Sequence, residues 1–242
     1  MKLDILAFAS HPDDAELGCV GTLLAHKAQG KKIGIVDLTR GELGTRGTPE
    51  TRAQEAAAAA AVLQLDAREN LGMADGFFRN DEEHQRKVIQ AIRKYQPEIV
   101  LMNAVQDRHP DHGRGSQLVS ESCFFSGLRQ IKTLDADGEE QQPWRPKAVY
   151  HYIQDRFITP DLIVDITPYW EQKVEAIRAF KSQFFTPASE NTSEPATYIS
   201  SPEFMRFIEA RALEFGHAIG AVYGEGFTKE RYIGVKNLFD LM

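Results

Sequence analysis

Residues 5–14 read Ile-Leu-Ala-Phe-Ala-Ser-His-Pro-Asp-Asp, an apolar run that leads directly into a polar cluster. A second apolar run, at residues 99–102, is followed by Asp-Arg-His-Pro-Asp-His at residues 107–112. Near-continuous apolar runs of this length are typical of strands that are covered on both faces. Each cluster therefore lies where a buried strand ends. If the two strands are neighbours in one sheet, their His and Asp side chains converge into a mixed N/O site of the kind that suits zinc.

Strand-like and helix-like segments alternate over the first two-thirds of the chain. We expect strands at residues 3–9, 33–38, 68–71 and 98–103, and helices at residues 14–30, from 49 onward, 82–95 and 114–130. This alternation predicts an α/β fold: a Rossmann-like, doubly wound and mostly parallel sheet with helices on both faces. Ligands of such sheets bind beyond the carboxyl ends of the strands, where strand order reverses. We therefore expect the active site at the carboxyl ends of the strands that precede the two clusters.

The last third continues with predicted strands at residues 148–153 and 162–166 and predicted helices at residues 168–181 and 202–220. Residues 134–146 are charged and contain proline, and residues 186–201 are rich in Ser, Thr, Pro and Asn. We expect an exposed connection and an exposed loop in these places. No boundary between independent domains is visible, so residues 1–242 are interpreted as a single domain.

Composition narrows the class of protein. The formal net charge of -7 gives no electrostatic support for nucleic-acid binding. No uninterrupted apolar stretch approaches the ~20 residues that span a bilayer, and the N-terminus lacks the pattern of a secretory signal. Cys19 and Cys123 have no partners in a metal motif and are interpreted as buried reduced thiols. These features favour a cytoplasmic protein that binds neither nucleic acid nor membrane.

The two clusters contain candidate ligands and candidate catalytic groups. A catalytic zinc site takes about three protein ligands and leaves a position for water. We expect His11, Asp14 and His112 to be these ligands. Asp13 is then free to act as the general base that accepts a proton from the water. His109 is expected near the substrate carbonyl, where it would stabilise the oxyanion and later protonate the leaving nitrogen.

Two further residues of the second cluster have open roles. Arg108 and Asp111 are candidates for contacts with the substrate or with the metal ligands. Asp111 could orient a histidine by accepting the proton of its other ring nitrogen. A single His-Pro-Asp-Asp could also be a turn at a strand end, with an Asp that caps the next helix. A second cluster at an equivalent place in the fold argues against coincidence, and we interpret the pair as a metal site.

His-Pro-Asp-Asp at residues 11–14, with Glu16, Gly18 and Gly21 after it, and His-Pro-Asp-His at residues 109–112 together carry a resemblance. In these motifs the chain resembles the LmbE-like (PIG-L) zinc N-deacetylases, which remove acetyl groups from substrates that contain N-acetylglucosamine. The resemblance covers nearly the whole chain, with further matches at residues 37–39, Arg52 with Glu55, the region of Gln183, and residues 223–227. Within this superfamily the chain is most similar to the bacillithiol-biosynthesis deacetylases, which act on N-acetylglucosaminyl malate.

The resemblance implies a role for each matched residue. The implied zinc ligands are His11, Asp14 and His112, the implied base is Asp13, and the implied oxyanion-binding and acid group is His109. Arg52 and Arg108 match positions that face the substrate, and Tyr198 lies in the loop that supplies a further oxyanion contact. Relatives in this family assemble as homo-oligomers, which implies a multimer here.

Malate is a dicarboxylate, and arginine binds carboxylates through paired hydrogen bonds. Arg46, Arg52 and Arg108 are all expected near the pocket. The sequence leaves the sugar's partner group open, so the alternatives include a mycothiol-type conjugate, an N-acetyl-chitooligosaccharide and an antibiotic glycoside. A non-catalytic, nucleotide-binding module in which the clusters are only turns is a further alternative. The ligand set also suits other divalent ions, so Fe²⁺ or Mn²⁺ could replace Zn²⁺.

Overall fold

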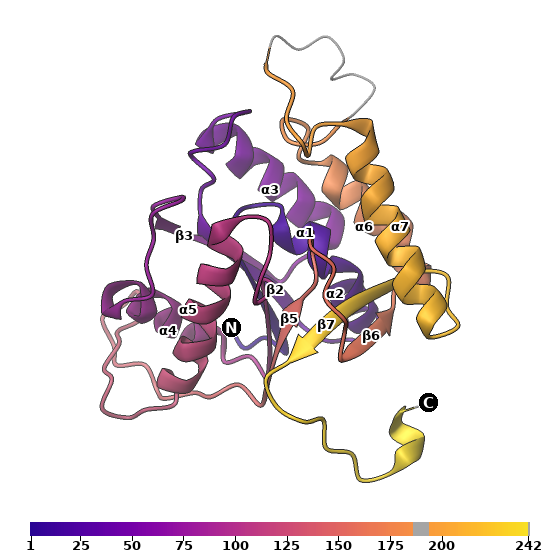
Figure 1. Ribbon diagram of the computed structural model, residues 1–242. Coiled ribbons are helices and arrows are strands. Elements are labelled where there is room, and N and C mark those ends of the chain that lie inside the picture. The colour runs from indigo at the N-terminus through magenta and orange to yellow at the C-terminus, as the bar shows by residue number, and fades with distance from the viewer. Residues whose placement is uncertain (186–193, 242) are drawn as a thin grey trace.

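The computed structural model describes residues 1–185 and 194–241, and its centre is a seven-stranded sheet formed by these residues (Figure 1). The strand order is β3-β2-β1-β4-β5-β7-β6. The strands are β1 (Ile5–Ala9), β2 (Ile33–Thr39), β3 (Ala67–Met73), β4 (Ile99–Met102), β5 (Ala148–Tyr152), β6 (Leu162–Asp165) and β7 (Gly224–Lys229). The first five pair in parallel, and β7 runs antiparallel to β5 and β6. The predicted α/β class with a mostly parallel sheet is confirmed.

Strand order reverses at β1, and this reversal positions the site. The chain runs from β1 to β2 and β3 on one side and then returns to β4 on the other side. Ala7 of β1 pairs with Ile35 of β2 and with Leu101 of β4, so β1 and β4 end at the same edge of the sheet. The two His/Asp clusters therefore meet at the switch point, where doubly wound sheets bind their ligands.

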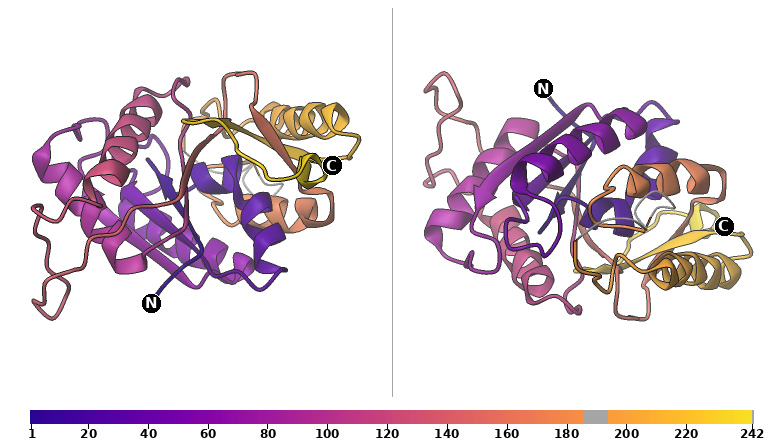
Figure 2. Two further views of the ribbon diagram at one scale, coloured as in Figure 1. Left: turned by 90° about the horizontal axis from the view of Figure 1, so that it is seen from below. Right: turned by 90° about the horizontal axis from the view of Figure 1, so that it is seen from above.

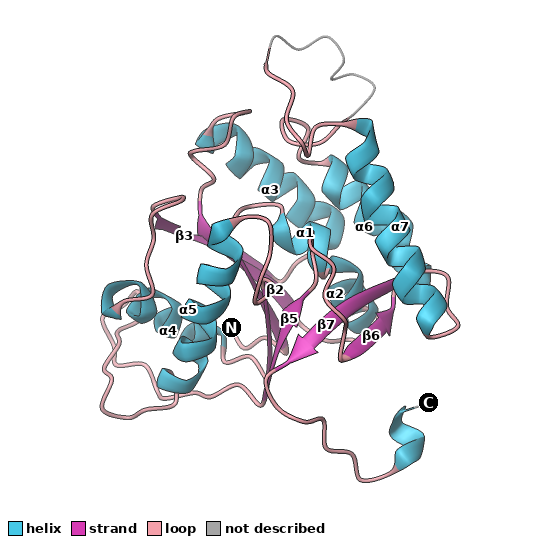
Figure 3. Ribbon diagram, viewed as in Figure 1, coloured by secondary structure: helices cyan, strands magenta, loops and turns pink. Residues whose placement is uncertain are grey.

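Helices cover both faces of the sheet, as Figures 2 and 3 show. The helices are α1 (Asp14–Gly18), α2 (Val20–Lys27), α3 (Pro49–Leu63), α4 (Glu82–Tyr95), α5 (Pro110–Phe125), α6 (Trp170–Arg178) and α7 (Pro202–Ala218), with short 3-10 turns η1 (Thr167–Tyr169) and η3 (Leu238–Leu241). Leu6 and Phe8 of β1 pack in one core with α4 and α5, whereas Ile5 and Ala7 pack in another with α2. Because both faces of β1 are buried, its sequence is a continuous apolar run.

The predicted helix at residues 14–30 is wrong, because α1 and α2 are separate helices that break at Cys19, where φ is -147°. Glu225, on the distant strand β7, accepts hydrogen bonds from the backbone N–H groups of Gly21 and Thr22 in the first turn of α2. Lys173 donates to the Leu17 carbonyl at the end of α1. The polar backbone groups at the break are thus satisfied by residues far away in the sequence, which local patterns do not reveal.

Two other elements differ from the expectation. Helix α5 begins at Pro110 instead of residue 114, and His109 is its N-cap. Strand β7 was not predicted, because Gly-Glu-Gly-Phe-Thr-Lys has neither the apolar alternation nor the composition of a strand. It forms because β5 and β6 pair with it on either side.

The segments expected outside the core lie mostly at the surface where they are described. Residues 134–140 are exposed, and residues 194–201 are exposed or half-buried. Residues 186–193, the first half of the loop expected at 186–201, lie outside the described residues. Both cysteines are free and buried. Among the described residues, no helix has the length and apolar character of a membrane span.

Candidate metal and catalytic site

The carboxyl ends of β1 and β4 open into a cavity of about 250 Å³. Its walls come from the turn after β1, the loop after β2, the turn after β3, the start of α5 and the segment before α7. The polar and charged side chains that line it are His11, Asp13, Asp14, Thr45, Arg46, Arg52, Asp75, Arg108, His109, His112, Gln154, Asp155, Gln183, Thr197 and Tyr198. All eight residues that the sequence predicts as ligands, catalytic groups or substrate contacts are in this set. Asp111 lies beside it, against His11.

The carboxylate of Asp14 lies between the rings of His11 and His112. Nδ1 of His11 lies 3.4 Å from Oδ2 of Asp14, and Nε2 of His112 lies 3.1 Å from Oδ1 of the same carboxylate. Ligand atoms of a tetrahedral site with bonds of about 2.0–2.1 Å are roughly 3.3 Å apart. Each of these two distances is of that size, although they involve different oxygens of Asp14, and the His/Asp donor chemistry suits a divalent metal ion.

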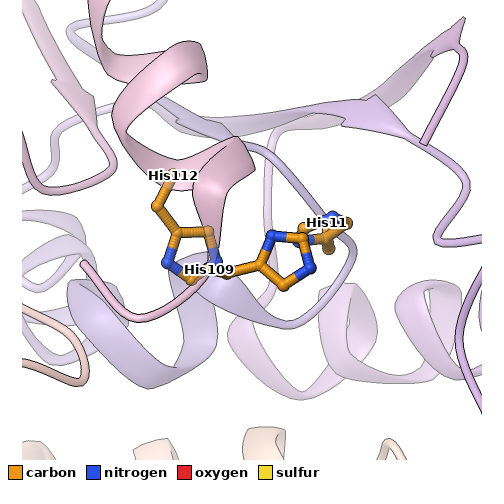
Figure 4. Close-up of side chains that lie close together, drawn as sticks. All are labelled: His11, His109 and His112. Atoms are coloured by element: carbon orange, nitrogen blue, oxygen red, sulfur yellow. The ribbon is translucent and has the colours of Figure 1, made fainter. Parts of the chain in front are cut away.

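His109 also belongs to the cluster, because ring nitrogens of His11, His109 and His112 lie within 4.8 Å of one another (Figure 4). The ring centroids of His11 and His109 are 4.6 Å apart, and those of His109 and His112 are 5.4 Å apart. A second group of possible ligands, within the same 4.8 Å limit, joins His11 to Asp75 and Asp111. The cluster can hold a metal in more than one combination of ligands.

Carboxylates orient both candidate histidine ligands. Nδ1 of His112 lies 2.8 Å from Oδ2 of Asp107, which leaves Nε2 directed toward Asp14. Asp107 in turn accepts hydrogen bonds from the backbone N–H groups of Arg108 and Arg156. A carboxylate behind a metal-binding histidine fixes the tautomer and the ring orientation. Sequence reasoning assigned no role to Asp107, although it is the first residue of the second cluster.

His11 has two carboxylates behind its other nitrogen. Nε2 lies 2.9 Å from Oδ1 of Asp75 and 3.5 Å from Oδ2 of Asp111. The structure thus places Asp111 against a histidine, and that histidine is His11. Asp75, the nearer acceptor, comes from the turn after β3 and was not singled out. The one available signal is its position in the short segment that follows the strand predicted at residues 68–71.

Two histidines of this cluster, His11 and His112, are held protonated by the carboxylates around them. Burial disfavours the charged form of His112, but the charge of Asp14 and the hydrogen bonds with Asp107 and Asp14 together outweigh it and raise the pKa of His112 to about 9. Burial also opposes protonation of His11, yet hydrogen bonds with Asp111, Asp14 and Asp75 raise its pKa well above the ordinary value. Burial by itself would raise the pKa of Asp14, but the two histidines hold it well below the usual range. A divalent cation would replace these protons.

Asp13 has an unusual backbone and a single cationic partner. Its φ of 135° lies in the region that favours glycine. Its Oδ2 lies 2.9 Å from Nη2 of Arg52. Burial raises the pKa of Asp13 to about 7. The charge of Arg52 opposes this rise, and the charge of Asp14 adds to it. A carboxylate with a pKa near neutrality suits general-base catalysis at neutral pH.

His109 presents a neutral N–H group to the cavity. As the N-cap of α5, its Nδ1 accepts a hydrogen bond of 3.2 Å from the backbone N–H of Asp111, so the neutral ring carries its proton on Nε2. Burial, followed by the charges of His11 and His112, lowers the pKa of His109. The ring can therefore donate a hydrogen bond to a developing oxyanion.

The arginines at the cavity differ in how their donors are used. Nε of Arg46 donates to the Ser182 carbonyl at 2.8 Å. The Arg108 side chain is 45% exposed, and its Nε lies 3.4 Å from Oδ2 of Asp155. Its guanidinium lies 4.8 Å from the centroid of the Tyr198 ring. Tyr198 and Arg108 therefore stand together at the cavity wall.

The fold and this site define a Rossmann-like protein with a buried His/Asp cluster suited to a metal ion. Residues 6–123 match the PIG-L family of GlcNAc-PI de-N-acetylases. The crystal structure of a conserved protein from Thermus thermophilus is 35% identical, with a TM-score of 0.83 over 97% of this chain and 98% of that one. The chain belongs to the PIG-L (LmbE-like) family, as its sequence motifs predict.

Three curated relatives indicate the activities found in this family. A diacetylchitobiose deacetylase of Thermococcus kodakarensis is 27% identical over 92% of this chain and 81% of its own length. A 4-oxalmesaconate hydratase of Pseudomonas putida is 24% identical over 74% of this chain and 73% of its own. A probable N-acetyl-alpha-D-glucosaminyl L-malate deacetylase of Bacillus anthracis is 26% identical over 77% of this chain and 84% of its own. Two of these three relatives are deacetylases of N-acetylated sugars.

Proposed function

We propose that this protein hydrolyses the N-acetyl group of an N-acetylglucosamine conjugate in a metal-dependent reaction. One observation carries the proposal: Asp13 and His109 line the same cavity as His11, Asp14 and His112. A base and a hydrogen-bond donor thus flank a cluster that suits a metal. Membership of a de-N-acetylase family and the two deacetylase relatives support the same reaction.

We propose Zn²⁺ as the metal, held by His11, Asp14 and His112, with Fe²⁺ or Mn²⁺ as substitutes. When bound, such an ion lowers the pKa of water toward neutrality and polarises a carbonyl group. Asp13 accepts the proton that the attacking water loses. The buried carboxylates behind the histidines keep the rings in place during the reaction.

His109 acts on the substrate side. Its Nε2–H donates a hydrogen bond to the carbonyl oxygen, on which negative charge develops as water adds. Asp13 then passes the proton that it has accepted to the leaving nitrogen, while His109 keeps its Nε2–H on the oxyanion. The amide C–N bond breaks, and the products are the free amino sugar and acetate. Tyr198 and Arg108 stand at the cavity wall, where a further oxyanion contact and the conjugated group would lie.

The substrate that we propose is N-acetyl-alpha-D-glucosaminyl L-malate, as in bacillithiol biosynthesis. The Bacillus anthracis relative supports this choice, and Arg108 offers a partly exposed guanidinium to a carboxylate. Diacetylchitobiose is a second candidate. One observation supports this second candidate. Arg46 and Arg52 already donate to groups of the protein, so few paired donors remain for the two carboxylates of malate. Diacetylchitobiose has no carboxylate to bind.

A panel of substrates separates these possibilities. Acetate release would be measured with N-acetylglucosaminyl malate, diacetylchitobiose and free N-acetylglucosamine, on protein of measured metal content. We expect the malate conjugate to give the highest kcat/KM. Asp13→Ala should keep its metal and lose most of its activity. A fully active Asp13→Ala variant would refute the base assignment, and hydration of an unsaturated acid without any acetate release would place the protein with the hydratase relative.

Three further expectations stay predictions. They are that residues 1–242 form one domain, that the protein works in the cytoplasm, and that it assembles as a homo-oligomer. Size-exclusion chromatography with light scattering would give the oligomeric state.

A further inference from the structure

Three adjacent strands each end in a polar residue, and two of these residues contact the carboxylate of the third. Asp14 follows β1, Asn103 follows β4 directly, and Gln154 follows β5. These strands are neighbours in the order β1-β4-β5, and Ala7, Leu101 and Tyr150 are in register across them. Their ends therefore lie side by side. Asn103 is 2% exposed and Gln154 is 5% exposed, so both amides are buried at the base of the cluster.

Both amides donate to Asp14. Nδ2 of Asn103 lies 3.1 Å from Oδ2 of Asp14, and the backbone N–H of His11 donates to the same oxygen at 2.9 Å. Nε2 of Gln154 donates to Oδ1 at 2.7 Å. A carboxylate oxygen has two lone pairs. Both lone pairs of Oδ2 are therefore occupied by hydrogen bonds. Oδ1 keeps one unoccupied lone pair, and this same oxygen lies 3.1 Å from Nε2 of His112.

The hydrogen bonds around the amides determine which way they point. Oδ1 of Asn103 accepts from the backbone N–H of Ser10 at 2.8 Å and from the Ser10 hydroxyl at 3.0 Å. A flipped amide would face the backbone N–H of Ser10 with its own N–H group, so Nδ2 points toward Asp14. Oε1 of Gln154 lies 3.3 Å from Nδ2 of Asn103, which in turn directs Nε2 of Gln154 toward Asp14.

We propose that Asn103 and Gln154 are positioning residues that hold the Asp14 carboxylate and leave Oδ1 as its metal-binding atom. This proposal rests on the metal site of the proposed function. Neutral amides suit the task, because a Lys or Arg in the same place would cancel the negative charge that attracts the cation. Neither residue touches the substrate or the metal in this assignment, and each acts through Asp14.

The test compares two glutamines at the same cavity. Gln154→Met removes the donor to Asp14 and keeps the length of the side chain. Gln183→Met is the matched control, because Gln183 is also 5% exposed and lines the cavity, but its Nε2 donates to the Arg46 carbonyl. Zinc dissociation constants would be measured by chelator competition. We expect Gln154→Met to bind zinc roughly 10- to 100-fold more weakly, since partners of metal ligands carry about that much affinity.

Additional measurements separate positioning from misfolding. Excess zinc should restore full metal content in Gln154→Met, which it would not do in a variant that fails to fold. If Gln154→Met does not fold, Gln154→Leu replaces it, because this smaller apolar side chain also removes the N–H donor and adds no charge. Unchanged zinc affinity in the folded Gln154 variant, or an equal loss in Gln183→Met, would overturn the proposal. Wild-type protein that binds zinc but releases no acetate would refute the proposed function alone.

Discussion

The guanidinium of Arg52 is paired with the carboxylate of Asp13, with Nη2 2.9 Å from Oδ2 and both side chains less than a tenth exposed. The same Nη2 donates to the Pro12 carbonyl at 2.6 Å, and Nη1 lies 3.4 Å from the Gly41 carbonyl. Arg52 thus holds the turn that carries the candidate base. The sequence predicts a substrate contact for Arg52, and the structure adds this second task.

Arg52→Gln should therefore impair the reaction more than substrate binding. Without its partner the Asp13 carboxylate is free to turn, and misplacement of a catalytic group by about 1 Å costs on the order of 100-fold in rate. We expect kcat to fall by roughly that factor, with a smaller change in KM. Metal content should hold, because Arg52 contacts none of the candidate ligands. Steady-state kinetics with metal analysis would measure all three.

Arg108→Gln provides the comparison, because Arg108 is half-exposed at the cavity wall and lies away from Asp13. Its loss should raise KM for the malate conjugate and leave kcat nearly unchanged. If instead Arg52→Gln raised KM alone, Arg52 would be a substrate ligand, and its pairing with Asp13 would not matter for the chemistry.

The backbone of Asp13 makes a second prediction, about stability. With φ at 135°, any side chain at this position is strained by about 1–3 kcal/mol, and glycine is not. Asp13→Gly should therefore be more stable than Asp13→Ala by about 1 kcal/mol or more. Both variants lose the carboxylate, so the lost pairing with Arg52 cancels in the comparison. Chemical denaturation of the two variants would give the difference.

Ala15 serves as the control position, because it is buried in the ordinary helical backbone of α1. Glycine there should lower the free energy of unfolding by about 1 kcal/mol. Equal stability of Asp13→Gly and Asp13→Ala would mean that the turn relaxes to an ordinary φ in solution, and the strain would then have no part in presenting the base.

The candidate metal cluster could be anticipated from the sequence because two simple rules apply to it. Buried parallel strands have continuous apolar sequences, and neighbouring strands end at the same edge of the sheet. His11, Asp14 and His112 each directly follow or closely follow such a strand, so their convergence needs no knowledge of the rest of the chain. The family resemblance then implies catalytic roles for Asp13 and His109 in place of metal binding, and these roles stay predictions.

Their supporting residues could not be found in this way. Asp75 and Gln154 follow β3 and β5, and their partners are His11 and Asp14 after β1. Such pairings depend on how far each turn extends beyond the sheet. The spacing of apolar residues along the sequence does not indicate this length. Strand β7 has the same difficulty, because its glycines give no strand signal and its neighbours supply the pairing.

Removal of the metal supplies a third prediction. Zinc that binds only the folded state stabilises it. With free zinc at about 100 times the dissociation constant, the free energy of unfolding rises by about 2.7 kcal/mol. For a chain of this size that is a rise of roughly 5–10 °C in Tm. Differential scanning calorimetry with excess zinc and with chelator would show it. His112→Ala should lose this zinc-dependent shift, and a shift of equal size in His112→Ala would remove His112 from the ligand set.

A buried ion pair outside the cavity gives the last prediction. Nζ of Lys173 lies 2.6 Å from Oε1 of Glu225, and both side chains are 3% exposed. Glu225 also accepts the backbone N–H groups of Gly21 and Thr22 at the start of α2. Lys173→Met would leave this carboxylate buried without a counter-charge, which costs about 3–5 kcal/mol. Urea denaturation would measure the loss.

Two comparisons test whether the charge itself is the cause. Lys132 and Glu140 form an exposed pair, so Lys132→Met should cost less than about 1 kcal/mol. Adding Glu225→Gln to Lys173→Met removes the unpaired charge, and the double variant should therefore be more stable than Lys173→Met alone. If the second substitution instead destabilised further, the carboxylate of Glu225 would matter mainly as the cap of α2. The break between α1 and α2 would then depend on the hydrogen bonds that Glu225 accepts, and the charge of Lys173 would contribute little to stability.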